Sequence, residues 1–561
     1  MKHKLFRKSV FSLLAGSIFI VLINIIGHYK FERFDLTSEK RYTLSDASMK
    51  LARNLDDVVY VRVYLEGEFP AGFQRLRNST KEMLDEFRAY SDNNIEYEFI
   101  NPSESSDDKI RNQLYKELIK QGLQPTSLQL KEQGGSAQKI IFPGAIFSYK
   151  ERQLPLQLLK NRMGAHPEEM LNNSVEGLEY EIANVIRKLK TDFQPKLAFI
   201  EGHGELTPIE VQDISQTLSQ YYRVERITIN EKLNALDGFK AAIVAKPTSR
   251  FSEKDKFILD QFIMSGGKTL WLLDGMTASM DSLIKTSVAM AIPNEINLGD
   301  QLFRYGVRIN MNLVQDLQAA AIPINTAVLG APPKWDYFPW AFFPLIIPQE
   351  NHPIVKNLNA IKFKFVSSID TVSAAGIKKT VLLRSSEYSR VLSSPVKITL
   401  ATITQRPDEK QFNRPYQAVA YLMEGTFTSV FKNRLPKNLA ESGDLGFLEI
   451  SKPNSMIIIS DGDVIRNEVQ QSSGQAYPLG FDRFTGQEFG NKDFILNCID
   501  FLCDDSDLIK VRSRELKLRL LDKTKIEKDR LSWQLANTSI PIIIVLIFGL
   551  VMSFIRKRRY K

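Results

Sequence analysis

The stretch FKAAIVAKPTSRFSEKDKFILDQFIMSGGKTLWLLDG, residues 239–275, places a helical segment between two short apolar runs. Ser252 is the expected N-cap of the helix, two acidic residues follow in its first turn, and a Gly-Gly pair at 266–267 ends it. Short apolar runs of this kind are typical of parallel strands buried on both faces. The stretch therefore predicts a strand–helix–strand unit of a parallel sheet.

The same alternation continues on both sides of this unit. Upstream, KLAFIEG (196–202) predicts a buried strand, and Thr207 to Glu210 form a capping box that opens the next helix. Downstream, SMIIISDGDVIRN (455–467) predicts a buried strand, and DFILNCIDFLCD (493–504) predicts a helix. We predict a doubly wound α/β domain over residues 191–504. It has a mixed insertion at about 276–414, and a strand pair is expected over 416–431.

Residues 28–190 are predicted to form a second α/β domain. Ser45 is expected to cap a short helix, and Val58 to Gly67 alternates as a strand. The elements that follow alternate helix and strand, then give a hairpin around Gly134 and Gly135 and a long helix. This order is that of a thioredoxin-like fold. The Cys-x-x-Cys motif of that fold is absent from the sequence, which excludes its redox chemistry.

Both ends of the chain carry an uncharged apolar run. Residues 10–27 and 535–555 are each close to the roughly 20 residues that cross a bilayer as a helix. The first run lacks a small-residue cleavage site, so we interpret it as an uncleaved anchor, with cleavage as the alternative. Residues 28–190 and 191–504 then lie between two transmembrane helices, and 505–534 is a charged juxtamembrane segment, expected to be helical.

The basic residues that flank the two runs predict the orientation. Four precede the first run within residues 1–9, five follow the second within 556–561, and no acidic residue lies among them. Basic flanks stay in the cytoplasm, so both termini are predicted to be cytoplasmic. These nine charges equal the formal net charge of +9, so the chain between them is balanced. The positive charge thus indicates membrane topology, and we expect no nucleic-acid binding.

Several kinds of chemistry are excluded by the motifs that the sequence lacks. The two cysteines, Cys498 and Cys503, lie five apart on one predicted helix, so two buried thiols are expected rather than a disulfide. No paired Cys or His spacing predicts a metal site. The SGGKT segment lacks the first glycine of a P-loop and runs from helix into strand, the wrong order. We predict no catalytic residue, no metal and no cofactor.

One loop is a candidate site for a ligand or a partner. In EGHGELTP, the side chains of Glu201, His203 and Glu205 lie between a buried strand and a helix N-terminus, where doubly wound folds bind ligands. His203 has the chemistry of a general base or metal ligand. The alternative, which we favour, is that the glycines permit a tight turn and the polar groups satisfy it.

Two further features concern partners and helix packing. The aromatic cluster Trp335, Tyr337, Phe338 and Trp340 is a candidate partner-binding or membrane-interface surface, although a core-packing loop is the favoured interpretation. The apolar runs hold small residues at helix-packing spacing and one amide. The candidate transmembrane packing residues are Ser12, Gly16, Asn24, Gly549 and Ser553.

Segments along almost the full chain resemble auxiliary subunits of ABC-type transporters. They include RFDLTSEKRYTLSDAS near the start, KLAFIEGHGE, LFRYGVRIN, ISDGDVIRN and the closing LRLLDKTKIEKD. Among these auxiliary subunits, the sequence resembles the GldG family of gliding-motility subunits of Bacteroidetes. The resemblance implies a partner permease, a separate cytoplasmic ATPase and further envelope or gliding-machinery proteins. It supplies no catalytic residue.

The sequence thus predicts a non-enzymatic accessory subunit of an ABC transporter required for gliding motility. It is expected in a bacterial inner membrane, with most of the chain in the periplasm. The alternatives are an extracytoplasmic ligand-binding module that uses the loop after Ile200, and an envelope hydrolase with an unrecognised site.

Overall fold

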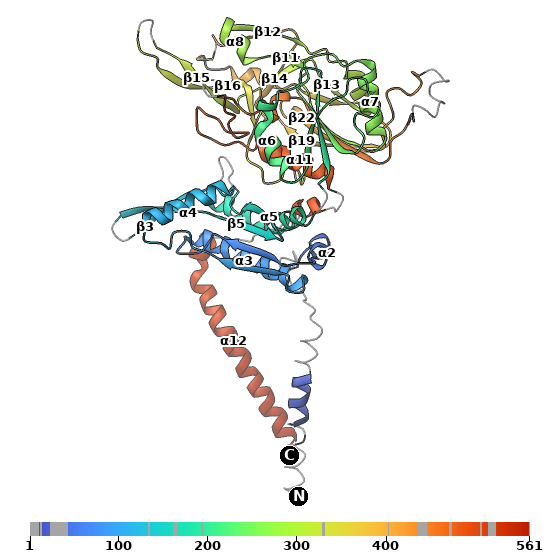
Figure 1. Ribbon diagram of the computed structural model, residues 1–561. Coiled ribbons are helices and arrows are strands. Elements are labelled where there is room, and N and C mark those ends of the chain that lie inside the picture. Colours follow the sequence, from blue (N-terminus) through green and yellow to red (C-terminus); the bar gives the residue numbers. More distant parts are fainter. Residues whose placement is uncertain are drawn as a thin grey trace. The chain divides into compact units, whose positions relative to one another are not determined.

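The computed structural model confirms a mixed α/β chain (Figure 1). It describes residues 11, 14–22, 43–132, 135–160, 166–191, 194–327, 331–401, 403–435, 446–470, 474–504, 508–513 and 523–559. The chain forms two units, Met1–Arg514 and Glu515–Lys561.

The first unit begins with a four-stranded sheet in the order β2-β1-β5-β6. β1 runs parallel to β2 and antiparallel to β5, and β5 forms a hairpin with β6. Alternate valines of β1 at positions 59, 61 and 63 are fully buried, as expected for a half-buried strand. The strands are β1 (Val59–Val63), β2 (Ile95–Phe99), β5 (Gly144–Tyr149) and β6 (Arg152–Gln157), and a separate hairpin joins β3 (Thr126–Glu132) to β4 (Gly135–Ile141).

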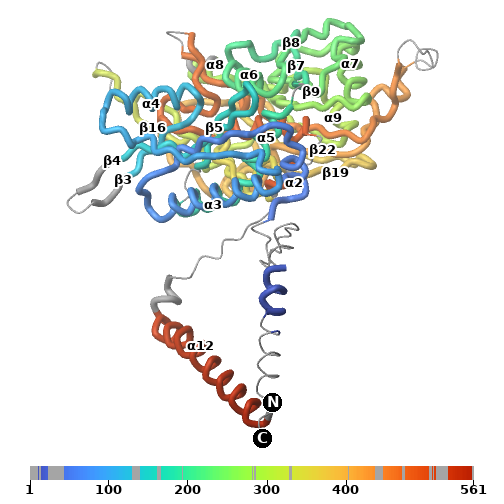
Figure 2. The backbone as a smooth tube through the Cα atoms, turned by 60° about the horizontal axis from the view of Figure 1, so that its bottom comes forward, coloured from blue at the N-terminus to red at the C-terminus, as the bar shows by residue number. Residues whose placement is uncertain are grey.

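Helices cover this sheet on both faces. α2 (Asp46–Arg53), α3 (Ala71–Tyr90) and α5 (Pro167–Lys190) share one hydrophobic cluster with β1, and α3 and α5 lie side by side (Figure 2). Leu118 of α4 (Asp108–Lys120) packs in a second, smaller cluster. As predicted, the side chain of Ser45 accepts the N-cap hydrogen bond of α2.

A seven-stranded sheet follows, in the order β19-β22-β23-β10-β9-β7-β8. Its five strands from β23 to β8 are parallel, and β22 and β19 are antiparallel additions at one edge. The parallel strands are β7 (Lys196–Glu201), β8 (Arg223–Thr228), β9 (Phe239–Ala245), β10 (Lys268–Leu272) and β23 (Asn454–Ile459), and the others are β19 (Ile377–Arg384) and β22 (Ala418–Gly425).

Each face of the parallel strands has its own hydrophobic cluster. α6 (Gln212–Ser219) and α11 (Asn491–Cys503) pack in one, and α7 (Glu253–Met264) and α9 (Gly299–Tyr305) pack in the other. The central residues of β7, β9, β10 and β23 are apolar because both faces are covered, whereas the edge strand β8 carries charged residues. The capping box at Thr207 is present, but it opens a short 3₁₀ turn, η1 (Pro208–Val211), before α6 begins.

Small sheets fill the predicted insertion. Their orders are β11-β12-β21, β13-β18, β14-β20 and β15-β16-β17. The elements are β11 (Met276–Thr277), α8 (Met280–Thr286), β12 (Val288–Pro293), β13 (Val307–Ile309), β14 (Asn312–Asp316), β15 (Ala319–Asn325), β16 (Trp335–Ile346), β17 (Ile361–Lys362), β18 (Ile369–Thr371), β20 (Ser389–Ser393), β21 (Val396–Thr399) and the 3₁₀ turn η2 (Glu409–Gln411).

Two local predictions are wrong. Within residues 416–431 only Ala418–Gly425 forms a strand, β22, rather than a strand pair, and the strand ends at Gly425, whose φ is +145°. The aromatic run from Trp335 is a strand rather than a loop, because it pairs with β15 over most of its length. The mixed α/β class is confirmed. The thioredoxin-like and doubly wound assignments and their boundaries stay predictions.

Two segments from opposite ends of the described part of the first unit pack into one hydrophobic cluster. Leu44, near its start, and Leu508, in the 3₁₀ turn η5 (Leu508–Ser513), are both 2% exposed and belong to the hydrophobic cluster of β1, α3 and α5. The seven-stranded sheet is therefore inserted, in sequence, between two segments that share one core.

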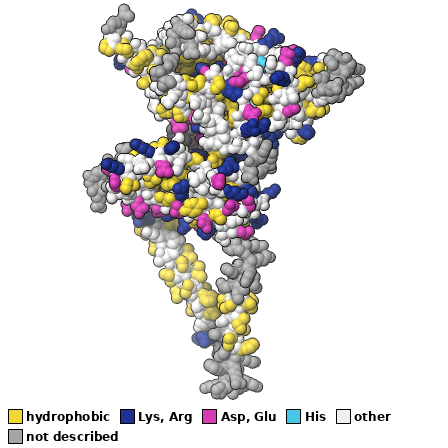
Figure 3. All heavy atoms as spheres, viewed as in Figure 1, with side chains coloured by type: hydrophobic (Ala, Val, Ile, Leu, Met, Phe, Trp, Pro, Cys, Tyr) yellow, Lys and Arg dark blue, Asp and Glu magenta, His cyan; other side chains and the backbone are white. Residues whose placement is uncertain are grey.

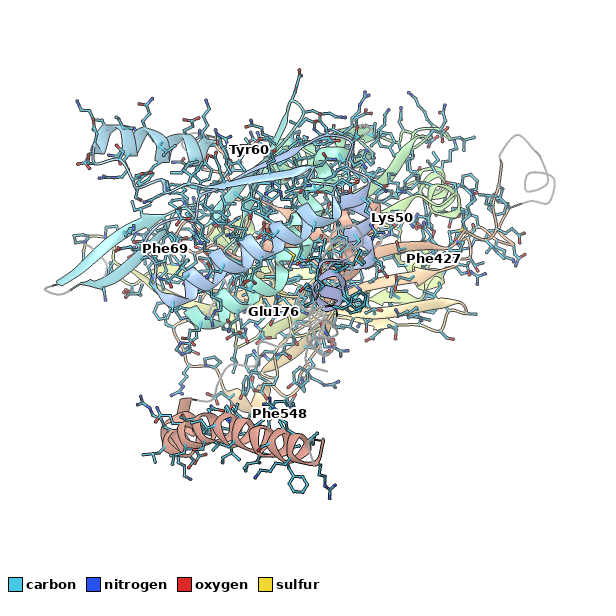
Figure 4. The ribbon with its side chains drawn as sticks, turned by 90° about the horizontal axis from the view of Figure 1, so that it is seen from below. Lys50, Tyr60, Phe69, Glu176, Phe427 and Phe548 are labelled. Carbon is cyan, nitrogen blue, oxygen red and sulfur yellow. The ribbon has the colours of Figure 1, made fainter. Side chains whose placement is uncertain are left out.

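The second unit contains the helix α12 (Lys523–Arg559). Among the described residues, Lys528–Arg558 is the one stretch of helix long and apolar enough to cross a membrane, judged by length and composition. Hydrophobic side chains run along α12 (Figure 3), and Phe548, labelled in Figure 4, is 65% exposed. Of the predicted first span, 10–27, residues 11 and 14–22 are described and are helical, and the other residues of the span lie outside the described residues.

Asp500 of α11 joins the two sheet-containing parts of the first unit. Its carboxylate lies 2.9 Å from the Lys188 ammonium of α5 and accepts a 2.7 Å hydrogen bond from the Tyr222 hydroxyl. Burial raises the pKa of Asp500, but Lys188 and Arg187 more than offset this, so its pKa is lowered. Asp500 is 4% exposed and the Lys188 side chain is 10% exposed, so removing Asp500 would leave a largely buried ammonium without its counter-ion.

We expect Asp500→Ala to reduce the free energy of unfolding by about 3–5 kcal/mol at pH 7. Because the folded pKa is lowered, the contribution of Asp500 is present above the unfolded pKa of about 3.9 and is lost as pH falls through the folded value. Urea unfolding of the full-length protein in detergent at several pH values measures this difference. The exposed Asp493→Asn on the same helix is the control, and an equal effect there would contradict the prediction.

Candidate functional site

The carboxyl ends of the parallel strands form the candidate site. The loop Glu201–Glu205 follows β7, Lys246 follows β9, Asp274 follows β10, and Asp461 and Asp463 follow β23. These strands are parallel neighbours, so their carboxyl ends meet at one edge of the sheet. Ligands of doubly wound folds bind at this edge.

His203 is held between two carboxylates. Its Nδ1 lies 3.1 Å from Glu205 Oε1, and its Nε2 lies 3.1 Å from Asp255 Oδ2. The ring stacks on Phe251 with centroids 3.6 Å apart, and the residue is 5% exposed. Burial lowers the pKa of His203, but Glu205 and Asp255 more than offset this, so its pKa is raised. Both ring nitrogens are thus engaged within the protein.

The rest of the loop is a tight turn. Gly202 and Gly204 have φ values of +111° and +73°, and a Cβ at Gly204 would lie 2.2 Å from Thr248 Oγ1. Glu201 instead forms an ion pair with Arg226. The structure therefore brings together two of the three predicted residues, His203 and Glu205. A ligand or partner role for the loop stays a prediction.

A larger ionic network lies beside this loop. The Lys246 ammonium contacts Asp463 and lies 3.1 Å from Asp274 Oδ2. The other Asp274 oxygen accepts a 2.6 Å hydrogen bond from the Gly462 amide. Asp461 accepts hydrogen bonds from the amides of Lys364 at 2.6 Å and Asp463 at 2.7 Å. Each carboxylate is bonded to the chain's own groups.

Burial and charge separate the pKa values of the three aspartates. Burial and the Asp463 charge raise the pKa of Asp461 well above its usual value. Burial also raises the pKa of Asp274, despite the neighbouring Lys246. Asp463 is buried too, but Lys246, Lys364 and Arg466 lower its pKa. The pKa of Asp463 is thus lowered, whereas the pKa values of Asp461 and Asp274 are raised. Together with the Lys246 ammonium, these carboxyls form a buried network that connects the ends of β9, β10 and β23.

Sequence reasoning missed this network. The available signal was positional, because each charged residue lies shortly after the end of a buried strand, in IVAKP, WLLDG and IIISDGD. The sequence does not show that Lys246 and Asp463, which are 217 residues apart, follow strands so close in one sheet.

The predicted aromatic cluster is divided by the alternation of β16. Trp335 and Tyr337 are 59% and 50% exposed, Phe338 is half-buried, and Trp340 is 4% exposed. Trp340 packs edge-on against Phe343, with ring centroids 4.9 Å apart. The four predicted aromatic residues therefore do not form one surface, and a partner-binding role for the exposed Trp335 and Tyr337 stays a prediction.

The remaining candidates lie in or near the apolar runs. Ser12 and Asn24 lie outside the described residues. Gly16 lies in the helical stretch 14–22, and Gly549 and Ser553 lie on α12. Their proposed helix packing stays a prediction. Within the ranges described above, no group of three or more His, Cys, Asp or Glu side chains is arranged to hold a metal ion. Cys498 and Cys503 are both buried and form no disulfide with each other, as predicted.

Comparison with known proteins identifies the class and then the family. The class is an auxiliary protein of ABC transport, because residues 194–498 match the auxiliary family described as an ABC-type uncharacterized transport system. This match spans more than half of the 561 residues, so the chain belongs to that family. It therefore has an accessory role in an ABC transport system, in association with transporter components. Residues 38–148 match a domain family of unknown function.

Other comparisons add little. No curated protein matches the chain. A solved structure titled "mmIFT52 N-terminal domain" is 13% identical, covers 55% of this chain and 96% of its own, and has a TM-score of 0.31. At that TM-score we infer nothing about fold or function from the similarity.

We expect Lys246→Met to lower the free energy of unfolding by about 3–5 kcal/mol at pH 8, because it leaves buried carboxylates without their counter-ion. The loss should be smaller at pH 5, where protonation relieves their repulsion. Urea unfolding at both pH values tests this. The control Lys254→Met removes an exposed ion pair and should have little effect. A loss independent of pH would contradict the electrostatic explanation.

His203→Gln should cost about 1–3 kcal/mol, because it leaves buried carboxylate oxygens without a partner. The folded pKa of His203 is raised, so its charged form contributes fully below the unfolded pKa of about 6.5, and this contribution is lost as pH rises through the folded value. The variant should therefore differ more from the wild type at pH 6 than at pH 9 in thermal unfolding. His166→Gln, at an exposed position, should show no such difference.

Proposed function

We propose that this chain is a non-enzymatic, membrane-anchored accessory subunit of an ABC transporter complex that serves gliding motility. The observation that carries the proposal is family membership through residues 194–498. The resemblance to gliding-motility subunits supports the more specific role. Under this proposal the partners are an ABC permease and a separate cytoplasmic ATPase, together with other envelope or gliding-machinery proteins.

The ends of the chain support anchoring in the bacterial inner membrane. Lys528–Arg558 has the length and the mean hydropathy, 2.6 in its apolar window, of a spanning helix. The apolar run at 10–27 supplies the second proposed anchor. Basic residues at the outer end of each run support cytoplasmic termini, so residues 28–534 would lie in the periplasm.

The chemistry of the sheet edge supports a non-enzymatic role. His203, Lys246 and Asp463 each bond to other groups of the chain and are largely buried. A catalytic acid or base must instead reach a substrate proton within hydrogen-bond distance. In the proposed complex, residues 28–190 form the thioredoxin-like domain and residues 191–504 form the doubly wound domain. They supply a binding scaffold while the ATPase supplies the energy.

The test is purification of the tagged full-length chain from its native membranes in mild detergent, followed by mass spectrometry. We expect the permease and ATPase in fixed stoichiometry with the chain. The control replaces residues 535–555 by an unrelated transmembrane helix of equal length, which keeps the anchor and removes its specific contacts. Recovery of the wild-type chain without either transporter component would contradict the proposal. Turnover of an envelope substrate by the purified chain would instead favour a hydrolase.

A further inference from the structure

An open cleft of about 1100 Å³ lies among α9, β13, β14, β18, β20 and the segment 430–434. No residue of the His203 pair or of the Lys246 network lines it. The charged side chains that line it are mainly cationic, and they are Arg304, Arg308, Arg414, Lys432 and Arg434 against Asp300 and Asp370. The lining therefore carries an excess of three positive charges, five minus two.

Some of these charges already have partners. Asp300 lies 2.8 Å from the buried Lys256 ammonium and 2.6 Å from Arg434, and Lys432 lies 3.1 Å from Glu449. Burial raises the pKa of Asp300, but Lys256 and Arg434 more than offset this, so its pKa is lowered and it stays ionised.

Three arginines remain without a carboxylate partner among the side chains that the structure describes. They are Arg304 of α9, Arg308 of β13, and Arg414, and all three are exposed. Asp370 lies opposite Arg308 in the β13–β18 register, but no described ion pair joins them. Guanidinium groups that converge without counter-ions raise the local potential for an anion.

Arg308 is also held in a defined orientation. Its Nε donates a 3.1 Å hydrogen bond to Asn310 Oδ1. Asn310 is 9% exposed and donates a 2.9 Å hydrogen bond to Ser368 Oγ, which is buried. This chain of bonds occupies Nε and leaves the two terminal nitrogens of the guanidinium for a ligand. A planar pair of N–H donors matches one carboxylate or phosphate in bidentate fashion.

The cleft has an apolar side as well. Phe303 and Met311 line it and are 51% and 62% exposed. Large apolar side chains beside free guanidinium groups suit a ligand that combines charge with a ring or a hydrocarbon part.

We propose that this cleft binds a small multivalent anion that carries two or more phosphate or carboxylate groups on an apolar or ring-shaped body. Arg308 takes one anionic group in bidentate fashion, and Arg304 and Arg414 neutralise the others. Phe303 and Met311 contact the body of the ligand. This inference goes beyond the proposed accessory function and requires neither the membrane anchor nor the transporter partners.

The test is isothermal titration calorimetry of the full-length protein in a neutral detergent. The probes are inorganic triphosphate and benzene-1,3,5-tricarboxylate, each titrated at about 0.05 M and 0.15 M NaCl. We expect at least one probe to bind with a Kd of about 0.1 mM or tighter. The probe that binds more tightly distinguishes a phosphate ligand from a carboxylate ligand.

Four variants separate a built site from general surface charge. R304Q/R308Q/R414Q should weaken binding at least about tenfold, whereas R88Q/R250Q/R406Q, which removes three exposed charges elsewhere, should change it less than about twofold. Arg308→Lys keeps the charge but loses bidentate geometry, so a loss of about three- to tenfold is expected. Asp370→Asn removes a repelling carboxylate and should tighten binding about two- to fivefold. Circular dichroism of each variant verifies the fold.

Three results would overturn the proposal. They are binding of neither probe at the higher salt concentration, an equal loss in the two triple variants, and wild-type affinity in both Arg308→Lys and Asp370→Asn. Because no transporter component takes part, failure here leaves the co-purification result unaffected.

Discussion

Lys246 holds the ends of three strands through two buried carboxylates, and this ionic contact follows from how the sheet is built. Parallel strands covered on both faces must be apolar along their length. Polar side chains are then confined to the strand ends, where neighbouring loops still bury them. A buried charge is tolerated only when it is paired and hydrogen-bonded. The network of Lys246, Asp274 and Asp463, and the pair of carboxylates around His203, both satisfy that constraint.

The same constraint explains what the sequence could reveal. Features that are set by residues adjacent in sequence match the predictions closely. They include the strands β7, β9 and β10 and the helix caps Ser45 and Ser252. β16 was missed because its prolines and aromatics resemble a loop, and only its pairing with β15 makes it a strand. The ionic network was missed because it depends on strand order, which residue patterns do not encode.

The candidate sites show the same difference between local and long-range signals. The sequence indicated His203 as a candidate because histidine is chemically versatile, yet Glu205 and Asp255 already occupy both ring nitrogens. The sequence did not indicate the arginines of the cleft as candidates, because single exposed arginines are common on protein surfaces. Arg304, Arg308 and Arg414 differ from such arginines because they line one cleft and have no carboxylate partner among the described side chains. Only the folded chain shows this arrangement.

The shared core at the two ends of the first unit has a mechanical consequence. Leu44 and Leu508 enter one hydrophobic cluster, so the shortest path of a pulling force applied at those two points runs through that cluster. The seven-stranded sheet, although it contributes most of the intervening sequence, would lie outside the load path. Tension between the ends of the unit would shear the packing of β1, α3 and α5 and leave the charged cleft and the sheet edge undistorted.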